Sequence, residues 1–521
     1  MQKITILVLA VLTLTGCNLL AAPTPTPAPT IVPTVIATLT AEPTATATVT
    51  ASPTETATET QTATITASPT ETLMPTITAT ASVTPAAIPV FRSDQLNLIT
   101  LPENIRDGID NAMIVFTNSN DQATIANIAT AQPENTTEIL YFTHRDSRDR
   151  VEVAILDSST GGQIYPEPSG KALAYFQPSG ATPGLYILNI QTLAAFSNRV
   201  WNTTNLVQRG IFSPPTWTAD GESLAVVLQT EYAVDIFLYS RDGSDRINLT
   251  QSGSYDFYPA FSPDGRYMAF VSDRATCPTW IPSEANFCDA LSEETPYGAT
   301  LYLMDLQTRE VRQVSDIFVT EAPRWINSRL LVFAGGDQTD LLNPQRTLWV
   351  ANVAVNTVNQ VLLEGDDSSI LYLSDTWSTD GSRVLFQRVT PSETQIILMN
   401  ADGRLIRGRG NDLSFPRFGM SAAWSPLDDR IAIGGSSGRC PYGIRVAEVD
   451  TFDWVATGNQ PVTCNPIFSP DGLNLAFTGI TSAVDGRLDM YSATSNGFGA
   501  QNLTGDLRGT INLIGWIGGQ P

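Results

Sequence analysis

A short motif recurs along the chain after residue 200 and limits the folds open to it. An aromatic residue is followed by Ser or Thr and then by a turn of the Pro-Asp-Gly type, clearest at residues 261–265 and 468–472 (both FSPDG). Five copies begin at Trp217, Phe261, Trp377, Trp424 and Phe468, and Trp325 looks like a decayed copy. The six positions in chain order are 44, 64, 52, 47 and 44 residues apart. A period in the forties is typical of a β-propeller, in which each repeat forms one four-stranded blade.

Each residue of the motif has a physical reason to stand at a strand–turn–strand junction. The aromatic residue ends a first strand and packs between neighbouring blades. Proline suits the second position of a type I turn, aspartate tolerates the third, and glycine takes the left-handed position that follows. We expect apolar second strands at residues 224–228, 268–271, 384–386 and 475–477, and third strands at residues 236–239, 301–304, 396–399 and 488–491.

These repeats closely resemble the WD40-like PD40 repeat of TolB and of the propellers in prolyl oligopeptidase-type enzymes. The resemblance covers roughly residues 160–500 and implies an all-β fold, a single propeller of seven or eight four-stranded blades over residues 91–521. Residues 139–142 and 172–176 look like second strands of two further blades. Residues 510–517 (TINLIGWI) are expected to pair with the first blade and remove an open edge.

The resemblance predicts the fold of this chain but not its binding partner. TolB has a small α/β domain before a six-bladed propeller. This chain has a Thr/Pro tract in that place and a higher expected blade count.

The N-terminus resembles a bacterial lipoprotein signal. Lys3 precedes an apolar run of eleven residues, 4–14, which is too short to span a membrane and has the length of a signal-peptide core. The run ends in LTGC, which resembles a lipobox, so residues 1–17 are expected to be a signal peptide and Cys17 the lipidated residue. This predicts a protein of the bacterial cell envelope, anchored by lipid alone on the extracytoplasmic side, at the cell surface or in the periplasm; an uncleaved anchor is the alternative.

Residues 18–90 predict a disordered linker. They are mostly Thr, Pro and Ala, and their only charges are four glutamates. Closely spaced prolines exclude sheets and helices, and the apolar content is too low to offset chain entropy. Such a tract favours extended polyproline-like conformations of about 3.1 Å per residue, which suits a spacer between membrane and propeller. Its Ser/Thr-Pro composition also suits O-glycosylation.

Four cysteines beyond Cys17 suggest two disulfides in an exported chain, with three possible connectivities. The repeat register favours Cys277–Cys288 and Cys440–Cys464. In an up-and-down blade, loops between second and third strands emerge on the same face as the blade-to-blade connections, so both bridges are expected on this long-loop face. Binding is expected there, and the candidate contacts are Arg274, Trp280, Tyr297 and Arg439. Without CxxC spacing, zinc is disfavoured and no metal is expected.

Catalytic interpretations find little support. His144 is the only histidine and is expected at the surface. Residues 434–438 (GGSSG) match the nucleophile elbow of hydrolases, but they follow a blade strand and no histidine comes later. The Asp-Gly loops, among them those of Asp242 and Asp489, lack the EF-hand calcium pattern. The Asn-x-Thr sequences at Asn248 and Asn502 are read as incidental.

Two function classes remain after these exclusions. The first is a non-catalytic, monomeric binding protein without a cofactor, whose long-loop face takes an envelope protein, a peptide or a glycan. The alternative is an extracellular hydrolase or lyase that uses carboxylates in the central channel. A third possibility is a structural or assembly role with no soluble ligand. The net charge of −23 and pI near 4.3 argue against nucleic acid as a partner.

Overall fold

The fold was obtained as a computed structural model. It describes residues 91–92, 112–119, 138–156, 163–177, 184–189, 194–198, 211–289, 296, 298–336, 346–367, 370–409, 413, 415, 419–436, 440–480 and 487–518. Contacts divide the chain into Met1–Ser82 and Val83–Pro521. The predictions for Cys17, for the signal peptide and for the linker to residue 90 lie outside the described residues.

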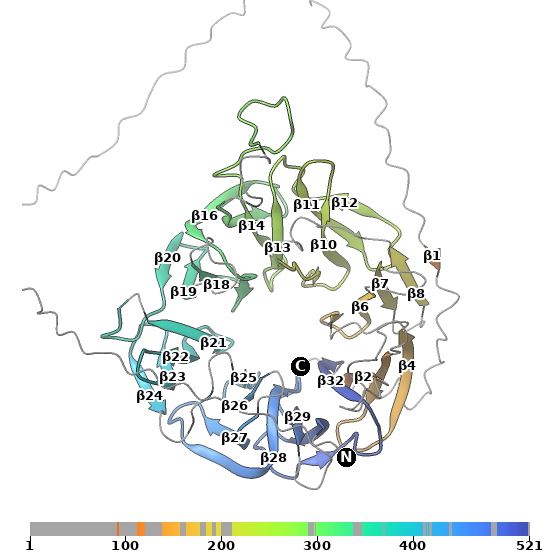
Figure 1. The fold of residues 1–521 in the computed structure, drawn as a ribbon, viewed down its shortest axis with the longest axis vertical. Helices are drawn as coiled ribbons and strands as arrows, with labels where there is room; N and C mark the ends of the chain where they lie inside the picture. The colour runs from red at the N-terminus through yellow and green to blue at the C-terminus, as the bar shows by residue number, and fades with distance from the viewer. Residues whose placement is uncertain are drawn as a thin grey trace, which may run out of the picture. The chain divides into compact units, whose positions relative to one another are not determined.

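Strands make up the regular structure of the described residues and form antiparallel blades in a ring (Figure 1). Blade 1 contains β32 (Thr510–Ile517), β2 (Met113–Ser119), β3 (Glu138–Thr143) and β4 (Arg150–Leu156). Blade 2 contains β5 (Ile164–Pro166), β6 (Ala172–Gln177), β7 (Gly184–Asn189) and β8 (Ala194–Asn198), with β1 (Phe91–Arg92) added at its edge. Blade 3 contains β9 (Thr216–Trp217), β10 (Ser223–Gln229), β11 (Val234–Ser240) and β12 (Arg246–Asn248). Blade 4 contains β13 (Asp256–Phe261), β14 (Tyr267–Ser272), β15 (Thr300–Asp305) and β16 (Val311–Phe318).

The second half of the chain completes the ring with four more blades. Blade 5 contains β17 (Arg324–Trp325), β18 (Leu330–Gly335), β19 (Thr347–Asn352) and β20 (Thr357–Gln360). Blade 6 contains β21 (Leu371–Trp377), β22 (Arg383–Val389), β23 (Thr394–Asn400) and β24 (Leu405–Arg409). Blade 7 contains β25 (Met420–Trp424), β26 (Arg430–Gly435), β27 (Gly443–Glu448) and the first part of β28 (Trp454–Phe468). Blade 8 contains the second part of β28, β29 (Asn474–Ile480), β30 (Asp489–Thr494) and β31 (Gln501–Asn502).

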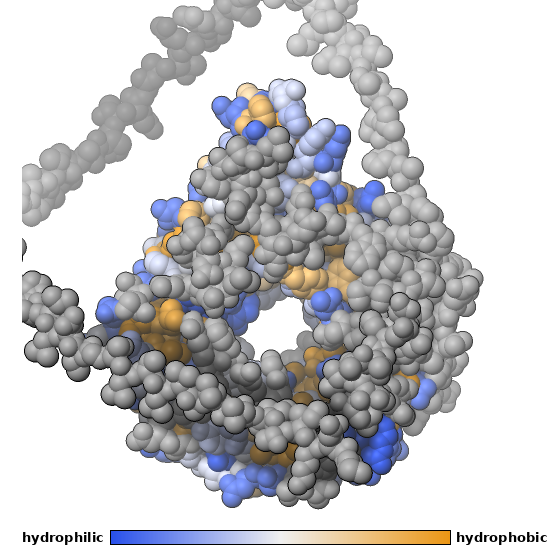
Figure 2. Space-filling view, in the orientation of Figure 1, coloured by the Kyte–Doolittle hydropathy of each residue, from blue (hydrophilic) through white to orange (hydrophobic). Residues whose placement is uncertain are grey.

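Eight blades therefore surround the central opening that Figure 2 shows, at the upper end of the predicted range. The predicted second strands lie inside β6, β10, β14, β22 and β29. The closing strand is confirmed: β32 pairs antiparallel with β2, from Met113 opposite Ile517 to Ser119 opposite Thr510. The described residues include no helix with the length and apolar character that a membrane span requires.

One strand assignment was wrong. Residues 139–142 lie in β3, the third strand of blade 1, and not in a second strand. The second strand is β2, which lies between β3 and the C-terminal strand β32. Because the first strand of this blade comes from the other end of the chain, the spacing to the next repeat is shorter than a whole blade.

The hydrophobic core is divided into layers at the seams between blades. One cluster joins blades 1 and 2 through Phe142 and Tyr175, and another joins blades 7 and 8 through Val446 and Phe477. The inner strands of a blade are covered on both faces, so they read as continuous apolar runs rather than alternating ones. The outer strands, such as β16, are largely exposed.

The aromatic residue of the motif fastens neighbouring blades, as expected. The indole N–H of Trp217 donates to the carbonyl of Tyr165 in blade 2, at 2.9 Å. Trp325 donates in the same way to Ala260 of blade 4, at 2.9 Å. Trp516 repeats the contact at the ring closure and donates to Ile467 of blade 8, at 3.1 Å.

Candidate functional site

The blades give the ring two unlike faces. Loops between second and third strands and the connections between blades emerge on the long-loop face. Turns between first and second strands and between third and fourth strands emerge on the opposite face, the turn face. In the FSPDG turn of blade 4, the Gly265 N–H donates to the Ser262 carbonyl at 2.9 Å, and Gly265 has φ +70°. Glycine is favoured there because other residues rarely adopt this conformation.

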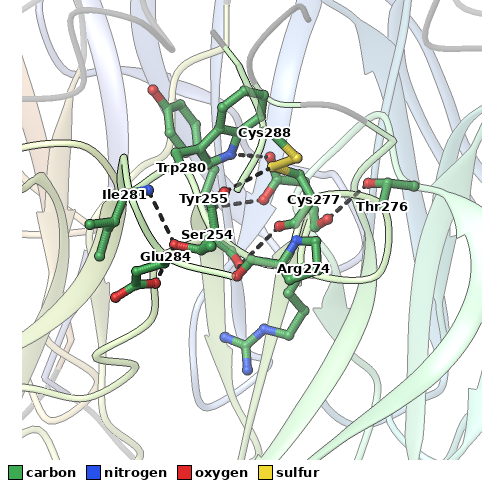
Figure 3. The surroundings of a disulfide bond; sticks show 12 residues. Ser254, Tyr255, Arg274, Thr276, Cys277, Trp280, Ile281, Glu284 and Cys288 are labelled. Atoms are coloured by element: carbon green, nitrogen blue, oxygen red, sulfur yellow. Dashed lines mark hydrogen bonds between the residues drawn. A yellow bond between two sulfur atoms is a disulfide. The ribbon is translucent and has the colours of Figure 1, made fainter. Parts of the chain in front are cut away.

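Figure 3 shows part of the loop between β14 and β15, which belongs to the long-loop face. Cys277 and Cys288 form a disulfide across it, with Cα atoms 5.8 Å apart. The Cys288 N–H donates to the Thr279 carbonyl at 2.8 Å, and the Trp280 N–H donates to the Gly253 carbonyl at 2.7 Å. The loop is thus closed on itself and attached to the segment that enters blade 4.

Trp280 packs this loop against the blade. Its side chain is 4% exposed, and its ring centroid lies 5.7 Å from that of Tyr255. Its indole N–H donates to Asp273 Oδ2 at 3.0 Å, while Asp273 Oδ1 accepts the Tyr255 N–H at 2.8 Å. Both the ring and its donor are therefore used inside the protein, and a ligand contact by Trp280 stays a prediction.

Arg274 is also engaged in the blade. Its Nη2 lies 2.9 and 2.7 Å from the two carboxylate oxygens of Asp256, which is fully buried, and its Nε donates to Ser272 Oγ at 3.0 Å. The guanidinium carbon lies 5.1 and 5.2 Å from the ring centroids of Phe270 and Tyr302. About a fifth of the side chain is exposed, 21%. The other two predicted contacts, Tyr297 and Arg439, lie outside the described residues.

The second disulfide links Cys440, in the loop between β26 and β27, to Cys464 in β28, with Cα atoms 5.3 Å apart. Both disulfides have the pairing that the repeat register favours. A Cβ on Gly434 would lie 2.9 Å from the Thr463 carbonyl oxygen, so the close approach of β28 requires glycine there. This packing accounts for the first residue of the GGSSG sequence without a catalytic role.

Four exposed aromatic residues lie on the long-loop face, and none of them was predicted. Phe212 is in the connection to blade 3 and Tyr232 is in the loop between β10 and β11, with 40% and 44% of each residue exposed. Phe287 lies in the disulfide loop and Phe318 ends β16, with 49% and 39% exposed. Among the described residues, Phe498 on the turn face is the other strongly exposed aromatic, at 56%. The available signal was their position in loops between strands or, for Phe318, at the end of a strand.

An ionic cluster joins the inner strands of blades 5 and 6. The side chain of Asp375 in β21 is buried and accepts hydrogen bonds from Arg324 in β17 and from Arg346, the latter at 2.6 Å. Arg346 also contacts Glu321 at 3.0 Å. Burial opposes ionisation of Asp375, but the attraction of Arg324 and Arg346 outweighs it and lowers the pKa of this carboxyl.

Asp235 is a buried carboxyl whose pKa is raised, in contrast to that of Asp375. Burial raises its pKa, against hydrogen bonds from Asn248 Nδ2 at 2.9 Å and Thr250 Oγ1 at 3.1 Å. The same arrangement recurs in blade 8, where Asn502 Nδ2 donates to Asp489 Oδ2 at 2.8 Å. Both Asn-x-Thr sequences thus fasten an outer strand to its neighbour. Among the described residues, no three His, Cys, Asp or Glu side chains gather as a metal site.

Comparison with known proteins agrees with the repeat. The family described as PD40, TolB beta propeller domain, matches residues 122–281. The chain is similar to the protein TolB homolog of Chlorobium luteolum, at 36% identity over 107 residues, which is 20% of this chain and 22% of the relative. The TolB homolog of Chlorobium chlorochromatii is 35% identical over the same length. The chain thus spans about a fifth of the length of these curated relatives.

Solved propellers are similar at greater distance. TolB from Acinetobacter baumannii is 16% identical, with coverage of 75% of this chain and 81% of that chain and a TM-score of 0.34. Oligogalacturonate lyase from Vibrio parahaemolyticus is 11% identical, with coverage of 74% and 97% and a TM-score of 0.40. Likeness at this level bears on no ligand or reaction. The chain is thus an eight-bladed β-propeller with TolB-like repeats, and the match to the PD40 family covers residues 122–281.

Proposed function

We propose that this protein is a non-catalytic binding protein whose long-loop face holds an envelope protein, a peptide or a glycan. The display of Phe212, Tyr232, Phe287 and Phe318 on that face carries the proposal. Large aromatic side chains dominate the binding energy of many interfaces, and few of their internal rotations are lost on binding. One of the four, Phe287, stands on the loop that Cys277 and Cys288 close.

The rigidity of this loop supports the same function. Binding costs conformational entropy whenever a loop must become ordered, and a loop that is already ordered avoids this cost. The disulfide, the Trp280–Asp273 hydrogen bond and the Arg274–Asp256 ion pair hold the loop and the strand ends beneath it. Arg274 and Trp280 therefore act by positioning Phe287.

The cellular setting belongs to the same proposal. Lipidation at Cys17 would place the protein on the extracytoplasmic side of the bacterial envelope, and residues 18–90 would carry the propeller away from the membrane. Without the linker glutamates and Lys3, residues 91–521 carry a formal charge of −20, which favours a neutral or basic partner over a nucleic acid. The propeller would act as a monomer, and the proposal requires no cofactor.

A channel hydrolase or lyase is the weaker candidate. Such an enzyme needs two reachable carboxyls, one of them protonated at working pH. Asp235 has a raised pKa and is connected to Asp256 through Ser252, which donates to both. However, these two carboxyls are 3% and 0% exposed, and Arg274 neutralises Asp256. Their burial keeps a substrate from both groups.

Substitution of the exposed aromatics tests the proposed function. A screen of purified peptidoglycan, envelope polysaccharides and envelope proteins first identifies the target of the unmodified protein. Full-length protein carrying Tyr232→Ala and Phe287→Ala should then bind this target at least about tenfold more weakly. Phe498→Ala is the matched control, because that side chain is as exposed but lies on the turn face. Equal weakening by Phe498→Ala, or substrate turnover by the unmodified protein, would contradict the proposal.

A further inference from the structure

The turn face is built from turns that contact one another from blade to blade. A Cβ on Gly221 in blade 3 would lie 1.7 Å from Glu167 Oε1 of blade 2. A Cβ on Gly381 in blade 6 would lie 2.6 Å from Leu330 of blade 5, and one on Gly472 in blade 8 would lie 2.7 Å from Leu427 of blade 7. Each of these glycines thus touches the preceding blade.

The seam between blades 6 and 7 is closed in another way. Asp428 takes the position of the turn glycine in blade 7, with φ +54°. Its carboxylate accepts the Thr379 N–H of blade 6 at 2.9 Å and also the Thr379 hydroxyl. Contact between successive turns is therefore maintained even where the glycine is replaced.

The seam between blades 3 and 4 departs from this pattern. No atom outside its own chain neighbours lies within 4 Å of a Cβ built on Gly265. The space between this turn and the turn of blade 3 is a cavity of about 540 Å³ that opens to solvent. This volume falls within the range of about 300–1,000 Å³ that small-molecule sites occupy.

The lining of this cavity combines apolar walls with two carboxylates. Leu238, Phe261, Pro263 and Leu306 supply apolar surface. Asp220 comes from the turn of blade 3 and Asp264 from the turn of blade 4, so the carboxylates belong to opposite sides of the seam.

Each aspartate uses one oxygen to hold its own turn. Asp220 Oδ1 accepts the Thr218 hydroxyl at 2.6 Å and the Glu222 N–H at 3.0 Å. Asp264 Oδ1 accepts the Ser262 hydroxyl at 2.6 Å and the Arg266 N–H at 3.2 Å. Within the described part of the chain, neither Oδ2 receives a hydrogen bond.

Arg241 and Arg266 form their ion pairs with other carboxylates. Arg241 pairs with Glu222 at 3.2 Å. Arg266 pairs with Asp305 at 3.4 Å, and its guanidinium carbon lies 4.8 Å from the ring centroid of Tyr267. A cation from outside the protein therefore meets two carboxylate oxygens whose charge these arginines do not neutralise by contact.

We infer that this cavity binds an alkylammonium or alkylguanidinium group, the chemistry of a lysine or arginine side chain. The apolar walls cover the aliphatic stem while the charged head lies between Asp220 and Asp264. This division of one side chain into apolar and charged parts is how lysine and arginine are commonly accommodated. The formal charge of −20 on residues 91–521 attracts such a group from a distance.

A titration of the full-length protein at low salt tests this inference. The probes are n-butylammonium, n-butylguanidinium and the blocked peptide Gly-Lys-Gly, and the neutral control is the same peptide with norleucine in place of lysine. We expect binding of the cationic probes that weakens as salt is raised, because the carboxylates are exposed and screened. If the Lys peptide binds, the cationic group that occupies the cavity comes from a side chain. If only the free amines bind, it comes from a small cation. Equal binding of the norleucine peptide would overturn the inference.

Two kinds of variant locate the site. Asp220→Asn and Asp264→Asn keep the Oδ1 acceptor of each turn and remove one charge; each should weaken binding about threefold, and both together about tenfold. Asp380→Asn is the matched control, because Asp380 Oδ1 accepts Ser378 Oγ and the Ser382 N–H in the equivalent turn of blade 6. Ala219→Phe fills the cavity without changing the charge and should abolish binding. Equal weakening by Asp380→Asn, or unchanged binding by Ala219→Phe, would refute the assignment.

Discussion

At the scale of single residues, the carboxylate of Asp375 is a buried charge held by two arginines. It is 1% exposed and lies between Arg324 and Arg346, whose side chains are 51% and 10% exposed. Trp377 also donates its indole N–H to Asp375 Oδ2 at 3.1 Å. Loss of one member of a buried ion pair leaves the remaining charges uncompensated, which costs far more than loss of a surface pair.

Asp375→Asn should therefore lower the free energy of unfolding by about 3 kcal/mol at pH 7. Asp402→Asn should change it by less than about 0.5 kcal/mol, because Asp402 and its partner Arg404 are largely exposed. The folded pKa of Asp375 is lowered, so its contribution is present above the unfolded pKa near 4 and is lost as pH falls through the folded value. Urea denaturation of both variants between pH 7 and pH 3 measures this.

The stability difference from wild type should depend on pH for Asp375→Asn but not for Asp402→Asn. The difference between wild type and Asp375→Asn should shrink on acidification, while the small difference for Asp402→Asn stays small. A constant difference of about 3 kcal/mol across this pH range would show that Asp375 acts through shape and not through charge.

Residue-level predictions from sequence were most complete where a turn fixed the geometry and least complete where the direction of a side chain mattered. The Asp and Gly of FSPDG were explained correctly because their roles are local to four residues. Trp280 was placed on the correct loop, but its indole points inward to Asp273, a choice that depends on the disulfide and on Gly253. No local sequence pattern indicated the ion pairs of Asp375, because its partners Arg324 and Arg346 are 51 and 29 residues away in the chain.

At the scale of elements, the loop between β14 and β15 is the clearest case of order imposed on a long connection. Its disulfide encloses few residues, with a sequence separation of 11. Three backbone hydrogen bonds depend on its closed form; they run from the N–H groups of Cys277, Trp280 and Cys288 to carbonyls of Asp273, Gly253 and Thr279.

Replacing both Cys277 and Cys288 by Ala should expose these amides. We expect their hydrogen exchange to become at least about tenfold faster, because local opening no longer has to overcome the cross-link. Exchange in β14 should change little. The matched control replaces Cys440 and Cys464 by Ala and should leave exchange in this loop unaltered. Unchanged exchange after loss of Cys277 and Cys288 would mean that Trp280 alone holds the loop.

The sequence predicted most elements well because propeller strands are short, apolar and separated by recognisable turns. The middle strands of blades 3, 4, 6 and 8 were placed to within a few residues. Blade 1 was assigned incorrectly because β2, its second strand, precedes all copies of the motif and receives its first strand from the C-terminus. The sequence pattern predicted that residues 510–517 pair with the first blade, but it did not identify β2 as the strand they pair with.

At the scale of the whole propeller, stability depends on closing the ring. β32 contributes to the cores on both sides of blade 1, since Ile511 belongs to the layer with blade 8 and Ile517 to the layer with blade 2. Every residue of its partner strand β2 is buried. Without β32, the edge of β2 would carry unpaired N–H and C=O groups beside an exposed apolar surface.

Deletion of residues 510–521 should therefore abolish the cooperative thermal transition and give a protein that self-associates, as circular dichroism and size-exclusion chromatography can measure. A synthetic peptide of residues 510–521, added in excess, should restore a cooperative transition because it supplies the partner of β2 and the Trp516 hydrogen bond to Ile467. The matched control peptide has the same composition in scrambled order and should restore nothing. A truncated protein that remains monomeric and unfolds cooperatively would show that the ring closes with only β2, β3 and β4 in blade 1. In that case the pairing of the chain ends would matter less to stability than the seam layers do.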